Sequence, residues 1–101
     1  MGSVAGANSY NTSGYIGAAI VGTSITLSFK DFSTSSTAEA LEGFLTINGN
    51  MGKRHIDLGN LPQTSGAFDL SVPEGTDISL FNTVVIREAG TDHTVGTASV
   101  P

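Results

Sequence analysis

Two histidines that each lie near a carboxylate are the residues of this sequence best suited to metal chemistry. His55 and Asp57 are two residues apart, so on a β-strand both side chains point to one face, and Asp92 directly precedes His93. Imidazole nitrogens and carboxylate oxygens bind zinc and related transition metals. The four residues would form a metal site if their two segments met, and are otherwise exposed polar residues. We expect the second arrangement, because nothing in the sequence requires the segments to converge.

Oxygen ligands for calcium are the second kind of site to consider. Glu74 with Asp77, or Asp31 with neighbouring hydroxyls, supply carboxylates, yet no spacing matches an EF-hand loop or a calcium-binding repeat. Asp77 is equally well explained as the N-cap of a short helical turn. We therefore expect no bound cofactor.

Catalytic arrangements are the third kind of site. Ser and Thr are frequent, but the sequence has no G-x-S-x-G nucleophile elbow. The absence of cysteine excludes thiol nucleophiles, thiolate metal sites and disulfides. The carboxylates that a glycosidase would need fall at predicted turns and strand surfaces. The sequence therefore favours a protein that is not an enzyme.

Tyr10 and Tyr15 indicate a binding surface instead. Aromatic side chains are enriched at protein interfaces, although tyrosine is also common at strand edges for packing reasons alone. We keep the pair as candidate contact residues.

Charge and length limit the partners. The 101 residues suit one domain, and the net charge of -5 comes with only four basic residues, Lys30, Lys53, Arg54 and Arg87. Nucleic acids and anionic membranes require several basic residues on one face, so we expect neither as a partner. No apolar run approaches the ~20 residues of a membrane span. We expect a monomer or weak oligomer with an unknown protein or envelope partner.

Alternation of apolar and polar residues predicts the strands that must position these side chains. A period of two recurs at residues 25–30, 41–47 and 68–72, and Pro73 ends the last of these. Further strands are predicted at 15–21, 56–58, 84–86 and 94–100, with a loop at 31–38, a hairpin turn at 48–50 and a helical turn at 78–81. The prediction is an all-β domain, an antiparallel β-sandwich or barrel of about seven to eight strands with one short helical turn.

The same alternation predicts the core and the domain boundary. Residues 1–13 show no periodicity and are expected to form a flexible N-terminal arm or a cloning remnant, which leaves one domain over 14–101. The side chains expected to be buried are Phe29, Leu45, Leu58, Leu70, Val84 and Ile86.

Several stretches, taken in order, resemble the DM-thirteen domain family. They are Thr12-Ser13-Gly14, Phe29-Lys30-Asp31-Phe32-Ser33-Thr34, Ile56-Asp57-Leu58-Gly59-Asn60-Leu61, Val72-Pro73-Glu74-Gly75-Thr76-Asp77-Ile78, Phe81-Asn82-Thr83-Val84-Val85-Ile86 and Gly96-Thr97-Ala98. The resemblance spans residues 12–100 and implies a small extracytoplasmic β-domain of secreted or envelope proteins, lipoproteins included, often associated with DOMON-type cytochrome domains. We expect such a location, with a targeting segment that this sequence does not include.

The family resemblance also implies a redox role, which rests on a cysteine after the penultimate strand. The corresponding region here reads Ile86-Arg87-Glu88-Ala89 and has no cysteine. The leading hypothesis is therefore a non-catalytic extracytoplasmic or cell-surface module for protein interaction or adhesion. The alternative is an accessory electron-transfer domain, which would need a bound metal or haem.

Overall fold

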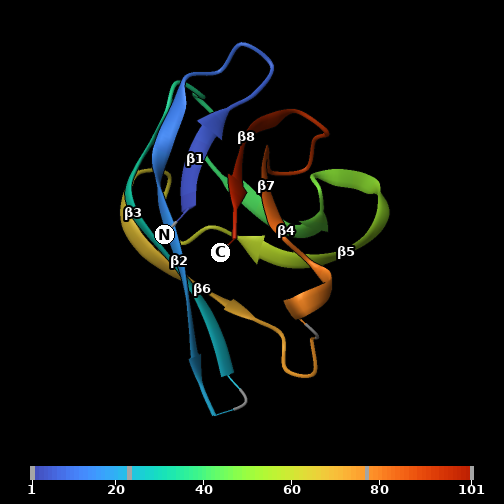
Figure 1. The fold of residues 1–101 in the computed structure, drawn as a ribbon. Coiled ribbons are helices and arrows are strands. Elements are labelled where there is room, and N and C mark those ends of the chain that lie inside the picture. Colours follow the sequence, from blue (N-terminus) through green and yellow to red (C-terminus); the bar gives the residue numbers. More distant parts are fainter. Residues whose placement is uncertain (1, 23, 77, 101) are drawn as a thin grey trace.

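Eight antiparallel strands form one curled sheet in a computed structural model that describes residues 2–22, 24–76 and 78–100 (Figure 1). The sheet order is β5-β4-β7-β8-β1-β2-β3-β6. The strands are β1 (Gly2–Gly6), β2 (Thr12–Val21), β3 (Ser24–Thr34), β4 (Leu41–Ile47), β5 (Asn50–Asn60), β6 (Gly66–Val72), β7 (Thr83–Glu88) and β8 (Thr94–Ser99). The predicted all-β class is confirmed.

β1 replaces the start of the expected flexible arm, and for these residues the prediction is wrong. Val4 lies opposite Gly14 of β2 on one edge and opposite Ala98 of β8 on the other, and its side chain is buried. Pairing on both edges satisfies the backbone groups of β1. The small residues of this segment carry no alternating pattern, which is why the sequence did not reveal the strand.

The inner face of the curled sheet encloses the core. Phe29 stacks on Phe68 with ring centroids 4.8 Å apart, and Phe32 meets both rings edge-on at 6.0 and 5.6 Å. Offset-stacked and edge-on contacts are the favoured geometries of aromatic pairs. The buried side chains include the predicted Phe29, Leu45, Leu70, Val84 and Ile86. Leu58 is only partly buried, contrary to prediction, because β5 lies at one end of the sheet and pairs only with β4.

β3 runs farther than alternation predicted. The expected loop at 31–38 begins as strand, because β3 continues to Thr34 and keeps Phe32 buried. Asp31 has a φ of 52°, and the pairing with β6 shifts register between Phe29 and Phe32. Such a bulge breaks the period of two and conceals the continuation of the strand.

The turns after β4 and β6 lie where the sequence predicts them. Asn48 and Gly49 adopt φ of 54° and 77° between β4 and β5, as the predicted hairpin requires. β5 starts directly at Asn50, earlier than the predicted 56. β6 ends at Val72, before Pro73, which has no N–H to donate.

The predicted helical turn is a 3-10 turn, η1 (Ile78–Leu80). Its proposed cap, Asp77, lies outside the described residues. No helix in the described part of the chain is long and apolar enough to cross a membrane.

Truncating Phe29 tests this core. Phe29 is 1% exposed and contacts two other phenylalanines, so Phe29→Ala should lower the free energy of unfolding by about 3–5 kcal/mol. Chemical denaturation monitored by circular dichroism measures the change. Tyr15→Ala is the matched aromatic control on the paired strand; Tyr15 is 48% exposed and should cost less than about 1 kcal/mol. Equal losses for the two variants would contradict the placement of Phe29.

Candidate binding face and the Glu88 network

The first pair of candidate metal ligands lies on β5 and makes local contacts. His55 Nδ1 is 3.0 Å from the Lys53 carbonyl oxygen, and its ring meets that of Phe44 edge-on at 5.8 Å. Asp57 Oδ1 accepts a hydrogen bond of 2.7 Å from the Gly59 N–H. Both side chains therefore have structural partners on β4 and β5.

The second pair lies in the connection between β7 and β8. His93 Nδ1 is 3.2 Å from Glu88 Oε1, and its Nε2 is 4.0 Å from Asp92 Oδ1. No group of three or more His, Asp or Glu side chains is placed to hold a metal ion in the part of the chain that the structure describes. The structure thus places the four candidates in two local arrangements on different elements.

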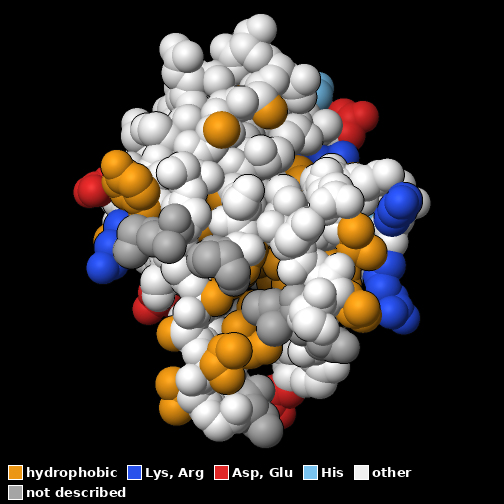
Figure 2. Space-filling model, viewed as in Figure 1, with side chains coloured by type: hydrophobic (Ala, Val, Ile, Leu, Met, Phe, Trp, Pro, Cys, Tyr) orange, Lys and Arg blue, Asp and Glu red, His pale blue; other side chains and the backbone are white. Residues whose placement is uncertain are grey.

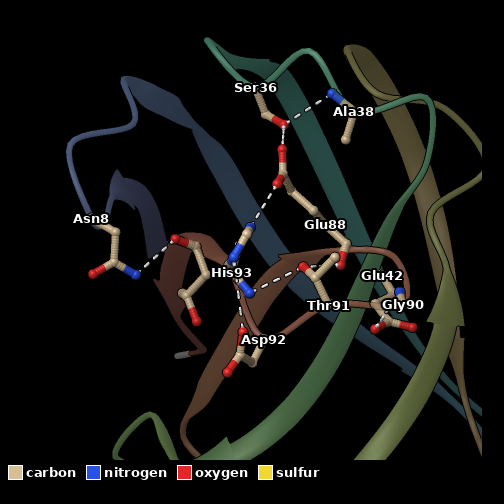
Figure 3. Close-up of polar contacts among 10 residues, drawn as sticks. Asn8, Ser36, Ala38, Glu42, Glu88, Gly90, Thr91, Asp92 and His93 are labelled. Carbon is tan, nitrogen blue, oxygen red and sulfur yellow. Dashed lines mark hydrogen bonds and ion pairs between the residues drawn. The ribbon is translucent and has the colours of Figure 1, made fainter.

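Glu88, the last residue of β7, contacts the β3–β4 connection and the β7–β8 connection (Figure 3). Its Oε2 accepts a hydrogen bond of 2.6 Å from Ser36 Oγ, between β3 and β4, and its Oε1 contacts His93, between β7 and β8. Tyr10, between β1 and β2, lies close enough to Glu88 for the two side chains to shift each other's pKa. We call these four residues the Glu88 network.

The order of groups in this network does not create a nucleophile. In a catalytic triad the imidazole lies between the hydroxyl and the carboxylate, and it accepts the hydroxyl proton. Here the carboxylate of Glu88 lies between Ser36 and His93 and accepts from both. The Ser36 hydrogen bond, followed by that of His93, lowers the pKa of Glu88 below its ordinary value, which makes the carboxylate a weak base.

The pKa of Tyr10 is shifted by its surroundings and by the same network. Partial desolvation raises the pKa of Tyr10, and the negative charge of Glu88 and the hydrogen bond to it add to the rise. The phenol therefore stays protonated in the neutral pH range. Asn8 Nδ2 adds a 3.1 Å hydrogen bond to the Thr94 carbonyl oxygen (Figure 3).

Sequence reasoning did not single out Glu88 or Ser36. The residues next to each in the chain form no functional motif, and the two are 52 residues apart. The only local signal was the pairing of Asp92 with His93, which led to a metal site and not to Glu88. The contact exists because β4 pairs with β7, with Leu41 opposite Glu88.

Both candidate tyrosines line hollows along β2. One hollow of about 520 Å³ contains Tyr10, a second of about 420 Å³ contains Tyr15, and the two share Ser13. A third of about 210 Å³ adjoins at Tyr15 and continues toward the β2–β3 hairpin. We call this strip the β2 face; its lining includes Ser3, Tyr10, Asn11, Ser13, Tyr15, Gly17, Ala19, Ser28, Lys30, Asp31 and Ser33.

The β2 face combines polar and apolar groups and is almost free of charge. Several hydroxyl groups line it. Its charged side chains are Lys30 and Asp31, which have opposite charges. An added Cβ at Gly17 would have open space around it, so the glycine leaves a dip between the flanking side chains. Tyr15 beside this dip is 48% exposed. Such a surface suits an uncharged polar ligand that stacks on an aromatic ring.

Comparison of the chain with models of protein families, with curated proteins and with solved structures finds no match. The resemblance to the DM-thirteen family stays a prediction, and function has to be argued from the side chains themselves.

The Glu88 network should make stability depend on acid pH. The pKa of Glu88 is lowered in the folded state, so its ionised form is favoured by folding. This contribution is complete above the ordinary value of 4.5 and is lost as the pH falls through the lowered pKa. The free energy of unfolding of the parent should therefore fall more steeply below about pH 4.5 than that of Glu88→Gln. Asp69→Gln, on the exposed surface of β6, is the matched control. Parallel curves for parent and Glu88→Gln would contradict the role given to Glu88.

The separation of the two histidines predicts the response to metals. Zinc or copper titrated calorimetrically into the parent and into a His55→Ala, His93→Ala variant should give the same weak, non-stoichiometric binding. The reason is that each histidine has its own local partners and too few further ligands. A tight one-to-one site that disappears in the double variant would contradict this and favour the electron-transfer hypothesis.

Proposed function

We propose that this domain is a non-catalytic binding module of an extracytoplasmic or cell-surface protein, and that the β2 face contacts its partner. The observation that carries the proposal is the position of Tyr10 and Tyr15 in adjoining hollows along one strand. Two residues chosen for their type alone thus belong to one continuous surface.

The physical character of the two tyrosines supports this role. A tyrosine offers a large apolar ring with a polar tip and loses little conformational entropy when it is immobilised. The serines of the β2 face supply donors and acceptors around the rings.

The charge pattern indicates the chemistry of the partner. The chain carries a net charge of -5, yet Lys30 and Asp31 balance each other on the β2 face. A strongly charged partner would find no complementary charge there. The proposed ligand is an uncharged, hydroxyl-bearing or amide-bearing segment on another surface molecule, either a protein loop or a glycan.

A binding screen tests the proposal. The intact domain is applied to arrays of uncharged peptides and of neutral glycans, and the dissociation constant of the best ligand is measured for parent and variants. Tyr15→Ala should weaken binding at least about tenfold, since exposed aromatic anchors dominate interface energy. Leu80→Ala is the control, because Leu80 is a comparably exposed apolar residue (47%) outside the β2 face. A ligand that is affected by Leu80→Ala and not by Tyr15→Ala, or that is chemically converted by the domain, would contradict the proposal.

A further inference from the structure

The β2–β3 hairpin extends beyond the strand that covers the rest of β2. Pairing of β1 with β2 ends where Gly2 lies opposite Ile16. Residues Ala18 to Val21 pair with β3 alone, and no other strand in the described part of the chain pairs with their second edge. In Figure 1 this hairpin projects from the lower end of the molecule. The backbone groups on that edge are open to another strand.

The outer edges of β5 and β6, at the two ends of the sheet, are protected against pairing with another strand, in contrast to the edge Ala18 to Val21. β5 carries Lys53 and Arg54 and is broken by register shifts against β4. Before β6, Gln63 Nε2 donates hydrogen bonds of 2.6 Å to the Ser65 carbonyl oxygen and of 2.9 Å to the carbonyl oxygen of Ala67 on β6. Charged side chains, bulges and capped carbonyls are the usual means of preventing edge-to-edge pairing.

The edge of the hairpin has none of these protections. No charged residue occurs from Ile16 to Phe29, although the whole chain is acidic. Ile20 and Val21 are 64% and 77% exposed, and hydrophobic side chains gather over the lower part of the molecule in Figure 2. Exposed apolar side chains and unpaired backbone groups thus coincide on one short strand. A lipid bilayer would cover the side chains but leave the backbone groups unpaired, whereas another strand satisfies both.

We propose that the edge Ala18 to Val21 pairs antiparallel with the same edge of a second copy of this chain. A two-fold axis through Ala19 would place Ala18 opposite Ile20, so that a small residue faces a large one. An antiparallel pair about such an axis is self-complementary in its backbone donors and acceptors. The hairpin is also the stretch where two copies with a net charge of -5 approach without facing like charges. The short edge makes a weak, concentration-dependent dimer the expected species.

Sedimentation equilibrium on the parent and on two lysine variants tests this pairing. The parent should dimerise with a dissociation constant between about 10 μM and about 1 mM, and Ala19→Lys should raise that constant at least about tenfold. Ala67→Lys introduces the same charge on the exposed edge of β6 and should leave it unchanged. Circular dichroism verifies that each variant folds, and Val21→Lys replaces Ala19→Lys if the latter does not.

Amide hydrogen exchange at low and high protein concentration locates the interface. Protection that rises with concentration should be confined to the hairpin. A parent that stays monomeric up to about 1 mM, equal effects of the two lysine variants, or protection elsewhere would overturn the proposal. A monomer that binds phosphatidylcholine vesicles through Ile20 and Val21 would overturn it in favour of a lipid surface. Sedimentation and exchange are measured without ligand, and Val21 lies outside the lining of the β2 face, so Val21→Lys separates self-pairing from ligand binding, whereas Ala19 belongs to both surfaces.

Discussion

The pairing of β1 on both of its edges is the interaction on which the rest of the molecule depends. β1 joins a half formed by β5, β4, β7 and β8 to a half formed by β2, β3 and β6. The core needs both halves, because Phe29 comes from one and Leu45 and Val84 come from the other. The backbones approach so closely here that an added Cβ at Gly96 would lie 2.9 Å from the Ala5 carbonyl oxygen. Glycine is required at that point, since a side chain would push β1 and β8 apart.

The same pairing creates the Glu88 network. Because β1 lies between β2 and β8, the connection that carries Tyr10 reaches the connection that carries His93, and Glu88 lies between them. Thr12 reinforces the junction, with its Oγ1 donating a 2.8 Å hydrogen bond to the Val95 carbonyl oxygen. These contacts tie the β1–β2 connection to β8. Glu88 links the connections that carry Ser36 and His93.

The two parts of β2 differ in how their edges are paired. Within the described residues, β1 pairs with β2 from Ser13 to Ile16, whereas Ala18 to Val21 pair with β3 alone. Tyr15 lies in the part of β2 that is paired on both edges.

Features that depend on neighbouring residues in the chain can be predicted from the amino-acid sequence alone. Side-chain direction or backbone dihedral preference over a few residues explains three of them. They are the alternation at 68–72, the end of the strand before Pro73, and the turn at Asn48 and Gly49. Tyr10 and Tyr15 were likewise chosen from residue type, before the hollows that connect them were known.

Tertiary structure decided what depends on segments far apart in the chain. Gly2–Gly6 have no pattern of their own and become a strand because β2 and β8 supply partners on both edges. Leu58 has the correct alternation but lies on a strand at the end of the sheet, where one side lacks cover. Ser36 meets Glu88 across 52 residues, and no local rule encodes that distance. Periodicity records which way a side chain points, whereas only the pairing of strands decides what it meets there.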